Sequence, residues 1–308
     1  MEPILSLRKL SSRLGTPVAR LYDIAENIDA HYELKVLEDK KIKGKYRHLR
    51  VPKAELKDIQ SCIKSNVLAR VPLAGEVHGG VRGRSPKSNA EKHLNRPCVV
   101  TLDVRSFFPK VRHYMVYRLL RHELGFGRDV ASLLTRLTTL DAQLPQGAPT
   151  STALANILLT VPVDGPVVSQ ARDTESCYTR FVDDMTISGQ NPRPLINFVA
   201  RMLSKRRLPM YREKGKAGAK PKLRITPRTR AQEVTGLIVN SPSGPSISRR
   251  RRDNVRAGIA SLRDLDEGAL PKAVNSLRGR INHVRQFNAG SAERLDRYLD
   301  KILSARRG

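Results

Sequence analysis

The chain has 308 residues, with 57 Lys and Arg against 29 Asp and Glu, which gives a formal net charge of +28. Hydrophobic residues make up 39% of the chain, enough for a folded core and too many for a disordered basic tail. Such an excess of cations favours a polyanionic partner, because each phosphate contact releases condensed counterions, but charge alone does not separate nucleic acid from an anionic membrane or a ribosomal surface.

The sequence predicts a cytoplasmic protein. It contains no run of about 18 apolar residues, so no segment is expected to cross a bilayer. Its first residues lack the basic and apolar regions of a secretory signal. Cys62, Cys98 and Cys177 are odd in number and lack C-x-x-C spacing, which predicts neither a zinc site nor a disulfide framework and fits a reducing compartment.

The first hundred residues combine helical patterns with a basic hairpin. Leucines recur at helical spacing through residues 1–35, with a break at 15–17, so this segment is predicted to be helical. Residues 40–52 predict a basic hairpin that turns near Gly44, and a helix is expected after Pro52. A glycine-rich loop follows at 77–85. The capping-box pattern at 88–91 then predicts a short helix that starts at Ser88 and carries His93.

The middle of the chain alternates strands and helices. Residues 98–104 predict a buried strand with Asp103 near its end, followed by a long helical region, a turn-rich loop at 144–151 and an apolar helix at 153–159. Residues 178–189 predict a hairpin whose turn carries Asp183 and Asp184. Neighbouring strand residues point to opposite faces, so two adjacent acids can serve one site only near such a turn. Their mutual repulsion is relieved by a cation.

The last third of the chain is strongly basic. Residues 201–230 contain 12 Lys and Arg and only Glu213 as an acid, which predicts either an exposed loop facing phosphates or a merely solvated face. Residues 234–240 predict one strand. A helical tail is expected from 249 to 308, with an apolar stripe inward and cations outward, among them Arg278, Arg280 and Arg285.

The three acids indicate a reaction class. Asp103 comes from one strand, and Asp183 and Asp184 come from a hairpin turn 80 residues later. A two-metal site for phosphoryl transfer needs carboxylates from separate elements, with one ion activating the attacking hydroxyl and the other steadying the leaving pyrophosphate. Nucleases and cyclases use the same layout, so the acids alone do not select an enzyme.

Five short motifs, taken together, resemble a known family. LDVRSFFP at 102–109, LPQGAPTS at 144–151 and RFVDD at 180–184 resemble, in this order, the palm motifs of reverse transcriptases. NAEKH at 89–93 and VTG at 234–236 are similar to elements of the retron branch of that family. The resemblance covers residues 46–240 and continues more weakly into the tail. It departs at Phe181-Val182, where the family usually has Tyr-Ala, and at Thr152, where proline is common, so the contacts to the primer end and the start of the helix are in question.

The resemblance implies an α+β right-hand polymerase fold with fingers, an antiparallel-sheet palm and a helical thumb. The N-terminal helices and fingers would span residues 1–98. The palm, with part of the fingers, would span 99–240. The helical thumb, which would recognise RNA, would span 241–308.

The resemblance also implies roles at the catalytic centre. Asp103, Asp183 and Asp184 match the metal-binding acids, with Asp103 and Asp183 as the more direct ligands of two Mg²⁺ ions, or alternatively of Mn²⁺. Phe108 matches the ring that would collide with a ribose 2′-hydroxyl and so select deoxynucleotides. An ordinary core aromatic is the alternative for Phe108, since either Phe107 or Phe108 must be buried.

Further residues match positions that bind the nucleotide. Gln146 matches a residue that meets the incoming nucleotide, and Arg47 resembles the fingers arginine over its base and phosphates, with Arg50 as a weaker candidate. Lys222 resembles the lysine near the triphosphate, a general acid for pyrophosphate, although a generic phosphate contact explains it equally well.

The two retron-like motifs are implied to bind nucleic acid. Asn89 and His93 lie one helical turn apart and would help to hold the RNA, or form a buried structural pair. Thr235 and Gly236 would allow the backbone to approach nucleic acid closely, or simply end a strand.

The implied activity is RNA-directed DNA synthesis from dNTPs on a structured noncoding RNA that supplies both template and primer. Priming would start from a 2′-hydroxyl of that RNA and leave branched msDNA. The family further implies a role in anti-phage defence beside a separate effector protein, away from membranes. Two alternatives are a group II intron or diversity-generating reverse transcriptase, and a basic RNA-binding protein whose polymerase site is silent.

Overall fold

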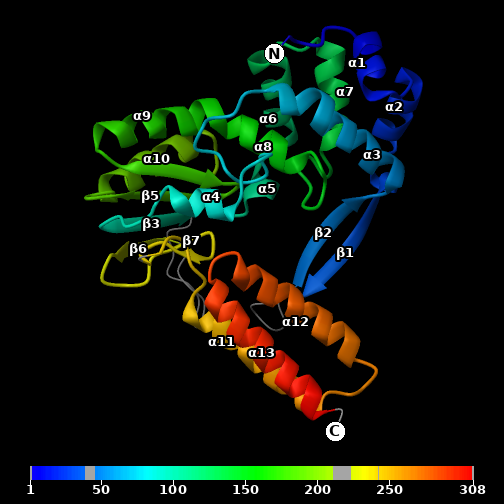
Figure 1. Ribbon diagram of the computed structural model, residues 1–308. Helices are drawn as coiled ribbons and strands as arrows, with labels where there is room; N and C mark the ends of the chain where they lie inside the picture. The colour runs from blue at the N-terminus through cyan, green and yellow to red at the C-terminus, as the bar shows by residue number, and fades with distance from the viewer. Residues whose placement is uncertain (1, 39–45, 211–222, 242, 307–308) are drawn as a thin grey trace. The chain divides into compact units, whose positions relative to one another are not determined.

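The computed structural model describes residues 2–38, 46–210, 223–241 and 243–306 (Figure 1). The chain forms two compact units, each assembled from two separate stretches. Unit 1 comprises Met1–Ser85 and Val100–Ile225, and unit 2 comprises Pro86–Val99 and Thr226–Gly308.

Most of unit 1 is helical, and its helices begin and end at recognisable signals. The Ser6 hydroxyl accepts a hydrogen bond from the Lys9 amide at the start of α1 (Leu7–Leu14), which ends at Gly15 with φ +66°. The other helices of this unit are α2 (Val18–Glu26), η1 (Ile28–His31), α3 (Ala54–Cys62), η2 (Ile63–Val67), η3 (Leu68–Arg70), α5 (Phe107–Lys110), α6 (His113–Arg118), η4 (Leu119–Glu123), α7 (Arg128–Thr138), α8 (Ser151–Leu159), η5 (Thr160–Asp164), α9 (Gly165–Asp173) and α10 (Arg193–Lys205).

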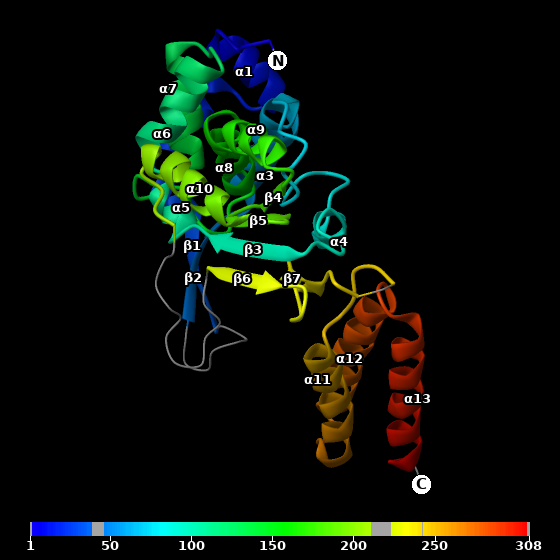
Figure 2. The same cartoon turned by 90° about the vertical axis from the view of Figure 1, so that its left-hand side faces the viewer.

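Two β-sheets accompany these helices. β1 (Tyr32–Glu38) pairs antiparallel with β2 (Tyr46–Pro52). A four-stranded sheet has the order β4-β5-β3-β6, formed by β4 (Cys177–Phe181), β5 (Asp184–Gly189), β3 (Cys98–Asp103) and β6 (Arg224–Pro227). β4 and β5 are antiparallel, and Figure 2 shows β5, β3 and β6 lying side by side in this order.

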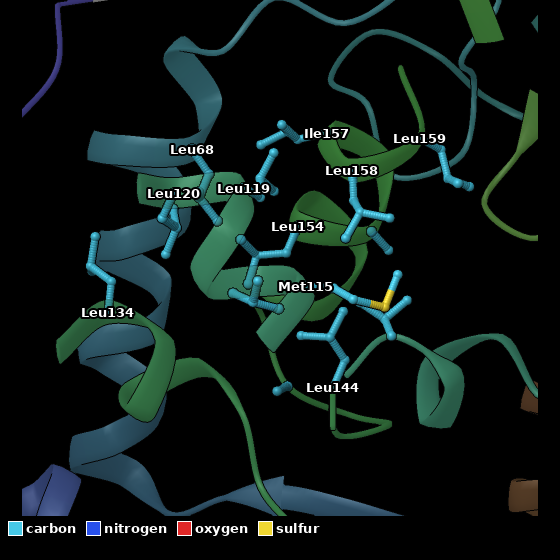
Figure 3. Packing of buried hydrophobic residues seen from close by; sticks show 14 of the residues in the cluster. Leu68, Met115, Leu119, Leu120, Leu134, Leu144, Leu154, Ile157, Leu158 and Leu159 are labelled. Carbon is cyan, nitrogen blue, oxygen red and sulfur yellow. The ribbon is translucent and has the colours of Figure 1, made fainter. Parts of the chain in front are cut away.

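The main hydrophobic core lies in unit 1. Figure 3 shows leucines of η4, α7 and α8 gathered around Leu119 and Leu154, both of which are almost fully buried. Met115 and Leu158 extend this cluster from α6 and α8. The core therefore fixes α6 and α8 against each other.

One helical stretch, Ser151–Asp173, is long and apolar enough to cross a membrane by length and composition. Just over half of its most apolar window, 56%, is buried inside the protein. Leu159, Val163 and Val167 of this stretch belong to the main core, and Asp164 within it is fully buried. We therefore interpret it as a core helix.

Unit 2 has its own core. α11 (Arg249–Ala260), α12 (Leu270–Arg285) and α13 (Ala289–Ala305) lie side by side in Figures 1 and 2, and η6 (Ser261–Asp264) follows α11. Their apolar faces share this core with α4 (Pro86–Glu91) and with the short strands β7 (Glu233–Val234) and β8 (Leu237–Ile238). The predicted helical tail is thus present as three helices.

Three of the predicted elements differ from the observed ones. Residues 32–35 open β1 instead of ending a helix, so the basic strand β2 pairs with residues 32–38. The short helix begins at Pro86, and Ser88 and Asn89 lie inside it. His93 follows this helix rather than lying on it. Residues 234–240 are not one strand, because the chain reverses between β7 and β8.

Candidate active site

The adjacent aspartates lie at a tight turn, as predicted. Phe181 at the end of β4 pairs with Asp184 at the start of β5, which leaves Val182 and Asp183 as a two-residue turn. Val182 has φ +61°, a conformation that glycine usually adopts at the first position of such turns. Asp183 is half-buried and Asp184 is exposed, so the two carboxylates have different surroundings.

The strand that carries Asp103 meets this turn. The backbone amide of Val104 donates a hydrogen bond to the carbonyl of Asp183, with 3.3 Å between nitrogen and oxygen. β3 also lies next to β5 in the sheet, and Asp103 is 7% exposed. The fold therefore brings the backbones of Asp103 and Asp183 together from segments 80 residues apart.

Carboxylate oxygens at this place suit a hard divalent cation such as Mg²⁺ or Mn²⁺. Among the described residues, no three His, Cys, Asp or Glu side chains form a ready-made metal cluster. Asp103 and Asp183, on adjoining backbone segments, fit as a ligand pair, whereas Asp184 is the exposed member of the three.

A buried arginine supports the turn from inside unit 1. Arg180 and Asp164 are both fully buried and form an ion pair of 2.6 Å between Nη2 and Oδ2. Arg180 Nη1 also donates to Asn156 Oδ1 at 2.8 Å and to the carbonyl of Val182 at 2.9 Å. The Tyr178 hydroxyl donates to Asp164 Oδ1 at 2.8 Å. One guanidinium thus ties the Val182–Asp183 turn to α8 and η5.

Electrostatics keep this cluster charged. Burial by itself would lower the pKa of Arg180, but the charge and hydrogen bonds of Asp164 outweigh it and raise that pKa. Burial and the neighbouring Asp164 carboxylate raise the pKa of Tyr178 well above its usual range, so its hydroxyl stays a hydrogen-bond donor. Arg180 therefore stays charged beneath the turn, and Tyr178 stays protonated.

The glycine loop at 77–85 packs against the other side of the turn. The amide of His78 donates to the carbonyl of Arg180 at 2.7 Å, and the amide of Arg180 donates to the carbonyl of Glu76 at 2.9 Å. A Cβ added at Gly79 would lie 2.5 Å from the Val182 nitrogen. Glycine is required here because the two backbones touch.

Sequence reasoning missed Arg180, Asp164 and Asn156 as supporting residues. A signal was present, since a charged residue in a strand between Tyr178 and Phe181 needs a buried partner to compensate it. The partner could not be named from the sequence, because Asp164 lies in a helical stretch that resembles any apolar helix.

The nucleotide side of the predicted site is assembled in the same unit. Phe107 is buried and Phe108 half-buried, with ring centroids 5.5 Å apart, so Phe108 is the ring that keeps an accessible face. The amide of Arg50 on β2 donates to the carbonyl of Gln146 at 2.9 Å. The amide of Leu144 donates to the carbonyl of Val111, just after α5. The Gln146 loop thus lies between β2 and the helix that carries Phe108.

Two of the predicted nucleotide-binding side chains lie outside the part of the chain that the structure describes. Lys222 and the side chain of Arg47 are not among the described parts of the chain. The side chain of Arg50 is exposed and lies 3.7 Å from the carboxylate of Asp141.

The reverse transcriptase (RNA-dependent DNA polymerase) family matches residues 38–224 of this chain, more than half of its length. The chain belongs to that family.

Curated retron proteins are similar to this chain over most of its length. The retron Mx65 reverse transcriptase of Myxococcus xanthus is 34% identical over 272 residues, covering 82% of this chain and 61% of its own. The retron Ec86 reverse transcriptase of Escherichia coli is 26% identical over 301 residues, covering 97% and 90%. The chain therefore spans about three fifths of the Mx65 protein.

A comparison with solved structures also finds a telomerase that is less similar in sequence than these retron proteins. The telomerase of Candida albicans, in complex with a fragment of telomeric RNA, covers 88% of this chain and 59% of its own, at 11% identity and a TM-score of 0.47.

The predicted membership among reverse transcriptases of the retron type is confirmed by the family match and the retron relatives, as is the α+β right-hand polymerase fold class. The division into residues 1–98, 99–240 and 241–308 stays a prediction.

The two motifs that resemble retron elements come together in unit 2 of this reverse transcriptase. The Thr235 hydroxyl donates to the carbonyl of Pro86 at 3.0 Å, at the start of α4. Thr235 and Gly236 have φ +47° and +84° and form the turn between β7 and β8. Asn89 and His93 are fully buried. Both polar side-chain atoms of Asn89 are buried without a hydrogen-bond partner among the residues that the structure describes.

The predicted thumb arginines divide into two kinds. Arg280 donates to the carbonyl of Asn254 at 3.0 Å, and Arg285 pairs with Asp296 of α13, so both hold helices of unit 2 together. Arg278 on α12 is exposed. Of these three, Arg278 is the side chain best placed for an external partner.

Proposed function

We propose that this chain is a retron reverse transcriptase that synthesises single-stranded DNA on a dedicated noncoding RNA, with dNTPs as substrates. The hydrogen bond between the Val104 amide and the Asp183 carbonyl carries this proposal, because it joins the two segments that supply the acids. The family match over residues 38–224 supports the same reaction.

Asp103 and Asp183 would hold two Mg²⁺ ions, with Asp184 as an outer partner. Such ions lower the pKa of the attacking hydroxyl and neutralise the charge of the leaving pyrophosphate. Arg180 would help to position Asp183, because its guanidinium donates to the carbonyl of the preceding residue, Val182. Phe108 would lie under the sugar, and Gln146 and the arginines of β2 would face the incoming nucleotide.

The catalytic assignment is tested by incorporation of labelled dNTPs by the purified chain with its RNA. Asp103→Asn and Asp183→Asn keep the side-chain shape and remove the charge, so we expect rates to fall about a thousandfold or more, since metal ions contribute several kcal/mol to such reactions. Asp58→Asn, at an exposed acid of α3, is the matched control and should retain full activity. Equal activity of Asp183→Asn and wild type would refute the assignment and favour a silent RNA-binding protein.

The branched product has a separate test. An RNA whose 3′-terminal diol has been oxidised by periodate cannot prime from its end, but its internal 2′-hydroxyls are intact. We expect DNA still to become covalently joined to this RNA. Synthesis on an annealed DNA primer without any joined product would leave the polymerase reaction standing and reject 2′-hydroxyl priming.

The biological part of the proposal is a role in anti-phage defence, in the cytoplasm and beside a separate effector protein. It predicts that cells carrying the gene with its flanking DNA resist phage infection and that Asp183→Asn removes the resistance. Equal plaque counts with and without the active gene, across a panel of phages, would reject this role.

A further inference from the structure

Unit 1 contains a cavity that shares no residue with the predicted active site. It measures about 430 Å³ and lies between α6, η4 and the end of α10. Its walls include Tyr114, Arg118, Lys205 and Arg207. We call it the α6–α10 pocket.

The pocket carries a positive charge that the described protein does not neutralise. Four cations line it against one acid, Glu123, which pairs with Arg206 at 3.4 Å. Arg118, Lys205 and Arg207 are exposed, and no ion pair joins their side chains to any acid in the described ranges. Three like charges around one hollow repel each other, so the pocket favours an anion.

The pocket also has an aromatic wall and an apolar floor. Tyr114 lines the pocket and is 44% exposed, so it is open to an external partner. Met115 and Leu158, both buried, form the floor and belong to the cluster in Figure 3. An aromatic face beside cations is what a nucleotide requires, because the base stacks on the ring while the phosphates meet the cations.

A basic ridge leads along α10 to this pocket. Arg193, Asn197, Arg201 and Lys205 are all exposed and recur every four residues, so they share one face of the helix. The guanidinium of Arg201 lies 5.5 Å from the centre of the Phe198 ring. A free nucleotide would use the pocket alone, whereas a nucleic-acid strand would use the ridge as well.

The pocket is tied to the catalytic strand by backbone contacts. Two residues after Arg207, the carbonyl of Pro209 accepts a hydrogen bond from the amide of Arg105 at 2.9 Å. Arg105 itself follows Asp103 by two residues. An occupant of the pocket would therefore be held by the same compact unit as the proposed catalytic acids.

We propose that the α6–α10 pocket binds one unpaired nucleotide of a single-stranded RNA segment whose phosphates follow the α10 ridge. This contact anchors RNA to unit 1 independently of the template in the active site. Its specificity is for an unstacked base, since a paired base cannot present its face to Tyr114.

The first test measures fluorescence anisotropy of a labelled 12-residue oligouridylate with the full chain at several KCl concentrations. Replacing Arg118, Lys205 and Arg207 by Ala removes three phosphate contacts, so the slope of log Kd against log salt should fall by about 2, at about 0.7 per phosphate of a single strand. The control replaces Arg8, Arg128 and Arg172, three exposed arginines of α1, α7 and α9, by Ala. It removes equal charge and should leave the slope unchanged. Equal changes in both triple variants would overturn the proposal, because a diffuse field would then explain binding.

The aromatic wall has its own test. Tyr114→Ala should weaken binding about tenfold, within the range of a base–aromatic stack, whereas Tyr114→Phe keeps the ring and should bind like wild type. Oligouridylate with 4-thiouridine should cross-link on irradiation to the peptide that contains Tyr114. A cross-link found only elsewhere, or equal affinities of Tyr114→Ala and Tyr114→Phe, would reject the stack. Thermal unfolding of each variant checks that the fold is retained.

The ridge distinguishes a strand from a free nucleotide. Arg193→Ala with Arg201→Ala should weaken oligouridylate binding while leaving the affinity for UMP unchanged. If UMP displaces the oligonucleotide completely and the ridge variant binds both ligands normally, the pocket is a mononucleotide site and the assignment to a strand is wrong.

Discussion

At the scale of single residues, the turn at Val182 and Asp183 depends on a close backbone contact that only glycine permits. Val182 has φ +61°, a conformation that costs a β-branched residue of the order of 1–3 kcal/mol and persists only where its surroundings hold it. Gly79 lies directly against it. The strained turn is thus kept in place by the loop that packs on it.

Gly79→Ala should therefore disturb catalysis without removing any catalytic group. Its Cβ would lie 2.5 Å from the nitrogen of Val182, so the turn must shift, and a displacement of about 1 Å can cost about 100-fold in rate. We expect kcat for dNTP incorporation to fall between about 10- and 100-fold. Gly75→Ala is the control, because nothing lies within 4 Å of its added Cβ. Wild-type kcat in Gly79→Ala would show that the turn tolerates the shift.

The buried ion pair leads to a prediction about stability. Arg180→Met would leave the carboxylate of Asp164 buried without a counter-charge, so the free energy of unfolding should fall by about 3–5 kcal/mol. Urea denaturation measures this loss. The double variant Arg180→Met with Asp164→Leu removes both charges and should recover much of it. A loss below about 1 kcal/mol in the single variant would contradict the role given to the pair.

The positions of the three acids could be predicted from the sequence, whereas the side chains that support their turn could not. The hairpin with Asp183 and Asp184 at its turn follows from local apolar runs, and the position of Asp103 near the end of a buried strand follows from the same kind of signal. The contacts of Arg180 with Asn156 and Asp164 are 24 and 16 residues away in the chain, and no local pattern encodes them.

At the scale of elements, α12 contains a histidine whose protonation should lower the stability of the folded state. His283 is half-buried against Phe287, with ring centroids 5.4 Å apart. Within the described part of the chain, its buried Nε2 has no hydrogen-bond partner. Burial, followed by the charge of Arg251, lowers the pKa of His283. The folded state therefore disfavours the protonated ring.

This direction fixes the expected pH dependence. The unfolded histidine titrates near pH 6.5, so the contribution of neutral His283 is fully present above that pH and is lost as the pH falls below it. The melting temperature of the wild type should thus decrease more between pH 7.5 and 5.5 than that of His283→Gln. His48→Gln, at an exposed histidine of β2, serves as control. Parallel curves for wild type and His283→Gln would reject the coupling.

Elements were predicted best where one face is buried. α7 shows that signal, and β3 was recognised as a nearly continuous buried run, whereas β1 is exposed at every residue after Tyr32 and has neither pattern. Ser88 fits a capping box, yet α4 begins at Pro86, because proline lacks an amide hydrogen and fits the first turn of a helix. The reversal at Thr235 depends on a positive φ that threonine rarely adopts.

At the scale of the whole molecule, the chain has two separate hydrophobic cores, and each should respond to its own mutations. Leu299 of α13 is 2% exposed within the core of unit 2. Leu299→Ala should lower the local free energy of unfolding by about 2–5 kcal/mol. Hydrogen exchange followed by mass spectrometry should show faster exchange in peptides from 249–305 and little change in α7 and α8.

The reciprocal variant completes this test. Leu154→Ala creates a cavity in the main core, where Leu154 is 1% exposed, and should accelerate exchange in unit 1. Global acceleration in both variants would mean that the two cores unfold as one.

Because residues 86–99 belong to the same unit as the C-terminal helices, the two halves of that unit depend on each other although 126 residues separate them in the chain. Cutting the polypeptide after Ile225 would deprive Ala90 and Val99 of the apolar neighbours that cover them. In a shortened protein, the apolar residues of segment 86–99 would then be exposed, and this segment should become sensitive to proteolysis. Loss of activity in such a fragment would therefore reflect the exposed segment 86–99 as well as the missing helices. Adding residues 226–308 as a second polypeptide should restore activity.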